Sequence, residues 1–159
     1  MVELFVKENK MKKVTFLFIA FGFTSFLQAQ TSNTKQQQEV QQAVVKMFEA
    51  LSNRDTISLK ANCTSDVTFY EYGEIWTVDT LISKAITTNT SSDFKRNNTF
   101  DFISTTTDKT MAWVTYRLNS VISKDGKQET VQWLETVVLA KEKKQWKVKH
   151  LHSTLIKRS

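Results

Sequence analysis

The chain has 159 residues, 40% hydrophobic and 24% charged, a composition that excludes a disordered protein and predicts one globular domain with a short extension. The formal net charge is +6, but the lysines and arginines are spread among acidic residues and form no basic run, which argues against nucleic-acid binding. Cys63 is the only cysteine, so an internal disulfide is excluded and a small buried side chain is expected there.

The first 29 residues have the features of an export signal. Three lysines within residues 10–13 form a basic segment, an apolar stretch follows over 14–26, and Ala29 offers a small residue at a cleavage point. The apolar stretch is too short for a transmembrane helix, and no cysteine stands at the cleavage point to carry a lipid. We therefore expect a cleaved signal peptide over 1–29, no membrane anchor, and a periplasmic or secreted mature protein.

Helical signals dominate the next part of the chain. A polar, glutamine-rich linker over 30–37 leads into the expected domain, 38–157. Apolar residues then recur at helical spacing from Val40 to Leu51, which predicts a helix that ends near Asn53. Two further short helices are expected, each behind an aspartate N-cap: 56–63 behind Asp55, and a segment behind Asp79 that ends at Ile86.

The rest of the chain reads as β-structure. Aromatic and β-branched residues predict a short hairpin over 67–77. Four long strands follow, separated by turn-forming clusters: 94–104, 111–123, 128–140 and 145–156. Helices followed by an antiparallel meander define the α+β class, with the helices covering one face of the sheet.

The turn between the second and third long strands sets their register. Asp125-Gly126 is a strong hairpin signal, and a two-residue loop there pairs Tyr116 with Glu135 and Leu118 with Trp133. The inward face of these two strands is then apolar except at the pair of Tyr116 and Glu135.

The loop before the final strand sets the next register. A two- or four-residue loop is expected to pair Glu135 with His150 and Trp133 with His152, whereas a three-residue loop would slip the register by one residue. The apolar pattern favours the first alternative. It predicts a polar row of Tyr116, Glu135 and His150 on the inward face of the sheet.

The first of the four long strands has two possible orientations. An odd loop near Asp108 turns Phe100 and Phe102 inward, while an even loop turns Asp101 inward beside Tyr116. The sequence does not decide between them. The second orientation would add a carboxylate to the polar row.

A helical hairpin and a meander that closes on W-K-V-K-H-L-H-S at 146–153 resemble the SnoaL-like branch of the nuclear transport factor 2-like superfamily. The resemblance covers 40–156, with further matches in D-V-T-F at 66–69 and W-L-E-T-V-V-L at 133–139. It implies a cone-shaped α+β barrel, with N-terminal helices packed in a strongly curved antiparallel sheet, an apolar pocket and frequent dimers. Family members include isomerases, cyclases, dehydratases and ligand carriers, so the resemblance does not define a reaction.

The polar row is the candidate catalytic site. His150 would act as base, Glu135 would orient it and raise its pKa, and Tyr116 would donate a hydrogen bond. Alternatively, the three side chains satisfy one another in a pocket wall. The candidate ligand-binding residues lie around them: Trp133, His152, Leu118, Tyr70 and Trp76.

Metal and cofactor motifs are weak or missing in the sequence. His150 and His152 with Glu135 form a poor ligand set for a metal, and no phosphate loop, nucleophile elbow or zinc motif occurs. We therefore predict neither a metal nor a cofactor.

The leading expectation is an exported domain that binds a small apolar or amphipathic molecule and forms a homodimer. One alternative is a proton-transfer enzyme of isomerase, cyclase or dehydratase type that acts on a small carbonyl compound. A purely associative dimer module with a closed pocket is the third possibility.

Overall fold

The structure is a computed structural model that describes residues 34–159. The predicted signal peptide at 1–29 lies outside the described residues. Within them, no helix is long and apolar enough to cross a membrane. The elements follow in the order α1 (Lys35–Ser52), α2 (Thr56–Ala61), β1 (Cys63–Glu71), β2 (Glu74–Trp76), α3 (Val78–Ile82), the π-helix η1 (Ser83–Thr87), β3 (Lys95–Thr107), β4 (Met111–Lys124), β5 (Lys127–Glu142) and β6 (Gln145–Arg158).

Helix α1 is the predicted first helix, and its apolar stripe from Val40 to Leu51 is buried. It starts with a capping box, in which Thr34 accepts a hydrogen bond from the N–H of Gln37 and the Gln37 side chain accepts one from the N–H of Thr34. The helix therefore begins at Lys35, inside the stretch that was predicted as a linker.

The two shorter helices have different caps. Asp55 caps α2 as predicted, because its side chain accepts a hydrogen bond from the N–H of Ser58. The predicted Asp79 cap is wrong: Thr77 caps α3 and accepts from the N–H of Thr80, while Asp79 lies in the first turn. Helix α3 continues directly into η1, and π-helical turns are often found at functional sites.

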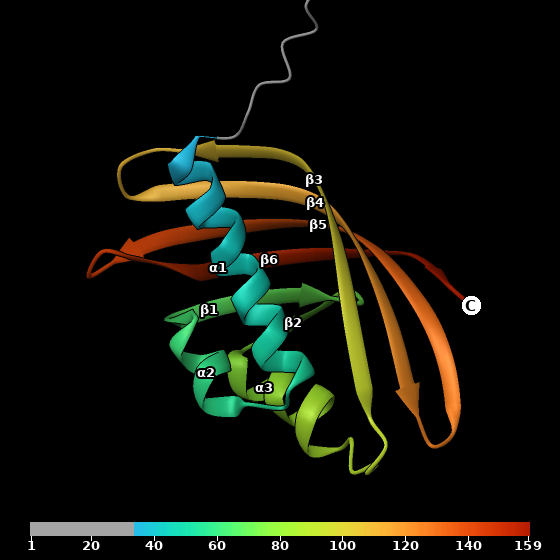
Figure 1. Ribbon diagram of the computed structural model, residues 1–159. Coiled ribbons are helices and arrows are strands. Elements are labelled where there is room, and N and C mark those ends of the chain that lie inside the picture. Colours follow the sequence, from blue (N-terminus) through green and yellow to red (C-terminus); the bar gives the residue numbers. More distant parts are fainter. Residues whose placement is uncertain (1–33) are drawn as a thin grey trace, which may run out of the picture. The chain divides into compact units, whose positions relative to one another are not determined.

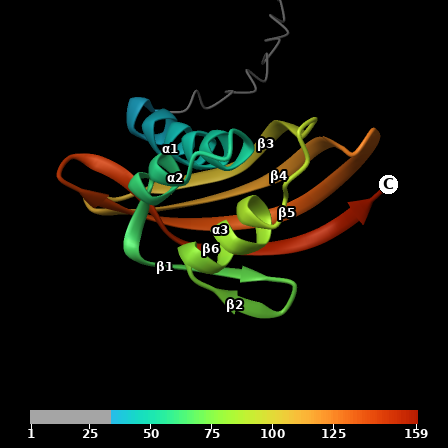
Figure 2. The same ribbon diagram turned by 90° about the horizontal axis from the view of Figure 1, so that it is seen from below.

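The six described strands form one curved sheet in the order β2-β1-β6-β5-β4-β3. Figure 1 shows α1 lying across this sheet, with β3, β4 and β5 bending strongly on one side of the helix. Figure 2 shows α1, α2 and α3 on the same side of the sheet. The α+β class and the cone-like curvature are thus confirmed. Strands β1 and β6 pair in parallel, which the predicted meander did not include.

The inner face of the sheet carries the core, together with Cys63. This cysteine is 2% exposed and has no disulfide partner, as predicted. Burial raises the pKa of its thiol to about 12, so the thiol stays protonated and unreactive at neutral pH.

Strands β3, β4 and β5 have clear registers. Tyr116 pairs with Glu135, which confirms the register predicted from the Asp125-Gly126 turn. Phe102 pairs with Tyr116 on the other side, and Asp101 points outward. The alternative with Asp101 beside Tyr116 is therefore wrong; Asp101 lies 3.6 Å from Arg117 on the exposed face.

The predicted register between β5 and β6 is wrong. The turn has one of the two expected lengths, two residues, but it pairs Glu142 with Gln145, which shifts the ladder by two residues from the predicted pairing. A β-bulge then leaves Lys149 without a partner between Val148 and His150. Because one extra residue exchanges the two faces of a strand, both histidines of β6 turn away from the core.

Candidate functional site

A cavity of about 210 Å³ opens between α1, the α3–η1 segment and the inner face of the sheet. Most of its wall is aromatic or aliphatic, and its polar residues are two glutamates, an arginine, a lysine and a tyrosine. The lining residues are Phe48, Leu51, Glu71, Tyr72, Trp76, Leu81, Lys84, Ala85, Arg96, Trp133 and Glu135.

Glu135 lies in the wall of this cavity. It sits on the inward face of β5 between Trp133 and Val137 and is 3% exposed. Its Oε1 accepts a hydrogen bond of 3.1 Å from the hydroxyl of Ser153, and the hydroxyl of Tyr116 also lies close enough to the carboxylate to stabilise its charged form and oppose the effect of burial on its pKa. Burial raises the pKa of Glu135 to about 7, so the carboxyl group exchanges its proton near neutral pH.

Glu71 provides a second carboxyl group. It ends β1 on the same face as Val67 and Phe69, which are buried in the core. Burial, and then the negative charge of Glu135, raise the pKa of Glu71 to about 7. The two carboxyl groups are therefore coupled, and ionising one makes it harder to ionise the other.

Arg96 brings a positive charge to the same cavity. Its guanidinium lies 5.5 Å from the centroids of the Phe48 and Trp133 rings. Nε donates a 3.0 Å hydrogen bond to Asn98, and Nη2 donates a 3.2 Å bond to Ser120. Burial lowers the pKa of Arg96, although the nearby carboxylates oppose this effect, and the guanidinium stays charged.

Tyr116 stands next to Glu135 in the ladder and is fully buried. Its ring packs edge-on against Phe48, Phe100 and Phe102. The hydroxyl forms no hydrogen bond of ideal geometry, but it lies close enough to the Glu135 carboxylate for each group to shift the pKa of the other. Burial, followed by the charge of Glu135, raises the pKa of Tyr116 well above its usual value, so the hydroxyl keeps its proton and remains a donor.

At the rim of the cavity, Trp76 interacts with Glu74 and Lys84. Its indole N–H donates to the carboxylate of Glu74 at 2.6 Å, and Lys84 donates to the same carboxylate oxygen at 2.8 Å. The Lys84 ammonium also lies 4.7 Å from the Trp76 ring centroid. Because Lys84 belongs to η1, this cluster ties the π-helix to the short β2 strand.

The structure does not bring His150 to Glu135 and Tyr116. His150 lies on the outer face of β6, where Nδ1 is 2.8 Å from the hydroxyl of Thr68 and the ring packs edge-on against Tyr70 at 4.6 Å. Burial, and then the nearby His152, lower the pKa of His150. The predicted row therefore keeps only two of its three members.

The other predicted ligand-binding residues also divide between the two faces. Trp133 and Trp76 line the cavity. Leu118 is buried but lines a separate hollow of about 200 Å³. Tyr70 and His152 are exposed and contact each other on the outer face of the sheet.

From the sequence we did not predict Glu71 and Arg96 in the cavity wall, or Ser153, which donates to Glu135. Glu71 follows Val67 and Phe69 at strand spacing, so the same alternation that predicts a buried face could have identified it. Placing Phe100 and Phe102 inward would also have placed Arg96 inward, because residues an even number apart on a strand share a face. Ser153 carried no such signal, because its inward position depends on the bulge.

The described residues do not form a metal-binding arrangement. Among residues 34–159, no group of three histidine, cysteine, aspartate or glutamate side chains is arranged to hold a metal ion. What the cavity provides is a pair of proton-exchanging carboxyl groups, a guanidinium and aromatic walls.

Comparison with known proteins agrees with this cone-like architecture. Residues 40–156 match the SnoaL-like domain family, and the chain belongs to this family. No curated protein matches the sequence.

Solved structures that share the fold are remote in sequence. A nuclear transport factor 2-like protein from Cytophaga hutchinsonii has 18% identity and a TM-score of 0.65, covering 77% of this chain and 100% of its own. A ketosteroid isomerase-like protein from Erwinia carotovora atroseptica has 14% identity and a TM-score of 0.63, covering 79% and 99%. A putative scytalone dehydratase from Novosphingobium aromaticivorans has 16% identity and a TM-score of 0.62, covering 78% and 86%. Such similarity establishes the fold and leaves the activity open.

Proposed function

We propose that this protein binds a small molecule of about one substituted ring in the cavity at Glu135. The observation that carries the proposal is an aromatic-walled cavity of about 210 Å³ that has the buried carboxyl group of Glu135 in its wall. An apolar cavity of roughly 150 Å³ is known to accept benzene. The volume therefore suits a ring with one or two polar substituents.

The wall also indicates how such a ligand would be oriented. Trp76 and Trp133 offer flat apolar surfaces, while Glu135 and Arg96 offer an acceptor and a donor. A ligand hydroxyl would donate to the carboxylate of Glu135, which compensates for the burial of that group. Export through the signal peptide and assembly into a homodimer belong to the same proposal.

Thermal-shift measurements with phenol and toluene test this binding mode. We expect both to raise the melting temperature, with phenol more effective because it can donate to Glu135. Glu135→Leu should remove the advantage of phenol and keep the response to toluene. His150→Ala on the outer face is the matched control and should leave both responses unchanged. Absence of any shift in the unmodified protein at millimolar ligand would contradict the proposal.

A second candidate function is proton transfer on a small carbonyl compound, which the raised pKa of Glu135 specifically favours. A base works best when its pKa lies near the working pH. Glu135 would take a proton from the carbon next to the carbonyl group, Arg96 would stabilise the negative charge on the oxygen, and the proton would return to carbon.

Hydrogen–deuterium exchange of cyclohexanone, followed by proton NMR, tests the second candidate. We expect the protein to accelerate exchange, with a rate that rises through pH 7 as Glu135 loses its proton. Glu135→Gln should reduce the acceleration by about 100-fold or more, in the usual range for loss of a general base. Retention of the rate in Glu135→Gln, or its loss in His150→Ala, would rule out this role for Glu135.

A further inference from the structure

A second hollow lies apart from the cavity at Glu135 and shares no lining residue with it. This groove has a volume of about 490 Å³ and runs between α1 from Lys35 to Lys46, the end of α2 and the turn between β5 and β6. Lys35, Lys46 and Lys144 line it, with Glu39 as its single acidic residue and Trp146 as a buried part of its wall. Its volume is in the usual range for small-molecule sites.

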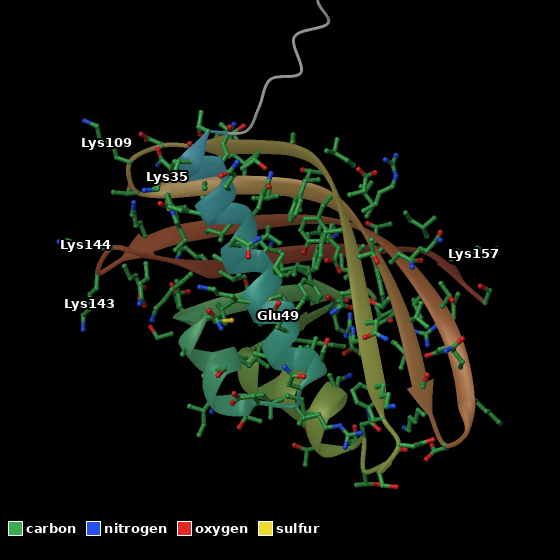
Figure 3. The ribbon with its side chains drawn as sticks, in the orientation of Figure 1. Lys35, Glu49, Lys109, Lys143, Lys144 and Lys157 are labelled. Carbon is green, nitrogen blue, oxygen red and sulfur yellow. The ribbon has the colours of Figure 1, made fainter. Side chains whose placement is uncertain are left out.

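The groove has an excess of positive charge. Three lysines face one glutamate, and Lys143 adjoins Lys144 at the rim. None of these four lysines forms an ion pair with any residue in 34–159. Figure 3 shows Lys35, Lys109, Lys143 and Lys144 at one end of the sheet, with Lys157 at the opposite end.

The backbone of the β5–β6 turn is unfavourable for the residues it contains. Lys143 and Lys144 have φ values of 47° and 70°, the left-handed region that glycine and asparagine prefer. The β4–β5 turn has the same conformation, with φ values of 53° and 70°, but uses Asp125 and Gly126, which suit it. The chain thus places two lysines in a turn where they destabilise the fold.

The start of α1 shows a similar mismatch. Lys35 is the first residue of the helix, and the first turn contains no acidic residue. A positive side chain is unfavourable at this end, where the helix dipole is itself positive. Residues that conflict with local structural preferences tend to mark function, and here both conflicts add positive charge to one groove.

Trp146 supplies a further unsatisfied group. Its side chain is 7% exposed, and its indole N–H has no hydrogen-bond acceptor in the part of the chain that the structure describes. The charge and the volume of the groove therefore indicate the kind of ligand.

We propose that this groove is a binding site for a small organic anion that carries carboxylate or phosphate groups. Lys35, Lys46 and Lys144 supply the charge, and Lys143 extends it at the rim. The site is independent of the function proposed for the cavity at Glu135.

Calorimetric titration of the full chain with inorganic pyrophosphate and with citrate tests this site. We expect at least one of them to bind, and the stronger of the two identifies the group that is recognised. The double variant Lys143→Asn/Lys144→Gly should melt about 4 °C higher without ligand, because its residues suit the turn. The same variant should bind the anion about tenfold more weakly. Weaker binding by a more stable protein cannot result from unfolding.

The control removes the same charge at the other end of the sheet. Lys127→Gln/Lys157→Gln should bind both anions like the unmodified protein. The proposal is overturned if neither anion binds at 10 mM or below, if the turn variant binds as tightly as the unmodified protein, or if the control loses affinity equally.

Discussion

Replacing Glu135 by glutamine should stabilise the protein at pH 8 by about 2 to 3 kcal/mol and leave its stability at pH 4 nearly unchanged. Burial raises the pKa of Glu135 from its usual 4.5 to about 7. Between these two values the folded protein holds a proton that the unfolded chain has released, so the free energy of unfolding falls as pH rises. A pKa difference of this size lowers the free energy of unfolding by about 3 kcal/mol once Glu135 is ionised in both the folded and the unfolded protein.

Chemical denaturation between pH 4 and pH 8 measures this effect. The unmodified protein should lose stability from pH 5 to pH 7, and Glu135→Gln should lose much less. Glu71 remains ionisable in the variant, and its own burial keeps part of the slope. Glu49→Gln on the exposed face of α1 removes the same charge and should leave the slope unchanged. If the free energy of unfolding fell equally steeply with pH in Glu135→Gln and in the unmodified protein, the raised pKa of Glu135 would be contradicted.

Replacing Leu151 by alanine should lower the free energy of unfolding by about 2 to 5 kcal/mol, the usual cost of removing a buried leucine side chain. Leu151 is 1% exposed because the bulge at Lys149 turns it into the core. His152→Ala on the opposite face should change the stability by less than about 0.5 kcal/mol.

This pair of variants tests the observed register directly. In the register predicted from sequence, His152 would face the core and Leu151 the solvent. In urea denaturation, the observed register therefore predicts a large loss of stability for Leu151→Ala only, and the register predicted from sequence predicts a large loss for His152→Ala only. A large loss for His152→Ala with little change for Leu151→Ala would restore the predicted register and return His150 to the cavity.

Much of the fold was predictable because its signals are local. The stripe on α1, the Asp55 cap and the Asp125-Gly126 turn each depend on a few neighbouring residues, and all three appear as expected. The pairing of Tyr116 with Glu135 follows from that turn alone. The same local signals were sufficient to predict the α+β class.

The site was predicted only in part because it depends on features without a local signal. The β5–β6 turn contains two lysines, which no turn rule favours, and the bulge at Lys149 leaves no mark on the alternating pattern. Together they moved His150 out of the cavity and brought Ser153 to Glu135. The inward placement of Arg96 depended on a choice of strand face that the sequence left open.

Burial makes Glu135, and Glu71 near it, exchange protons near neutral pH inside the cavity. Carbon-13 NMR of the side-chain carboxyl groups, followed from pH 3 to pH 9, measures this directly. We expect two glutamate resonances with midpoints near pH 7, one of which disappears in Glu135→Gln while the other moves to lower pH. Titration of every glutamate below pH 5.5 would contradict it.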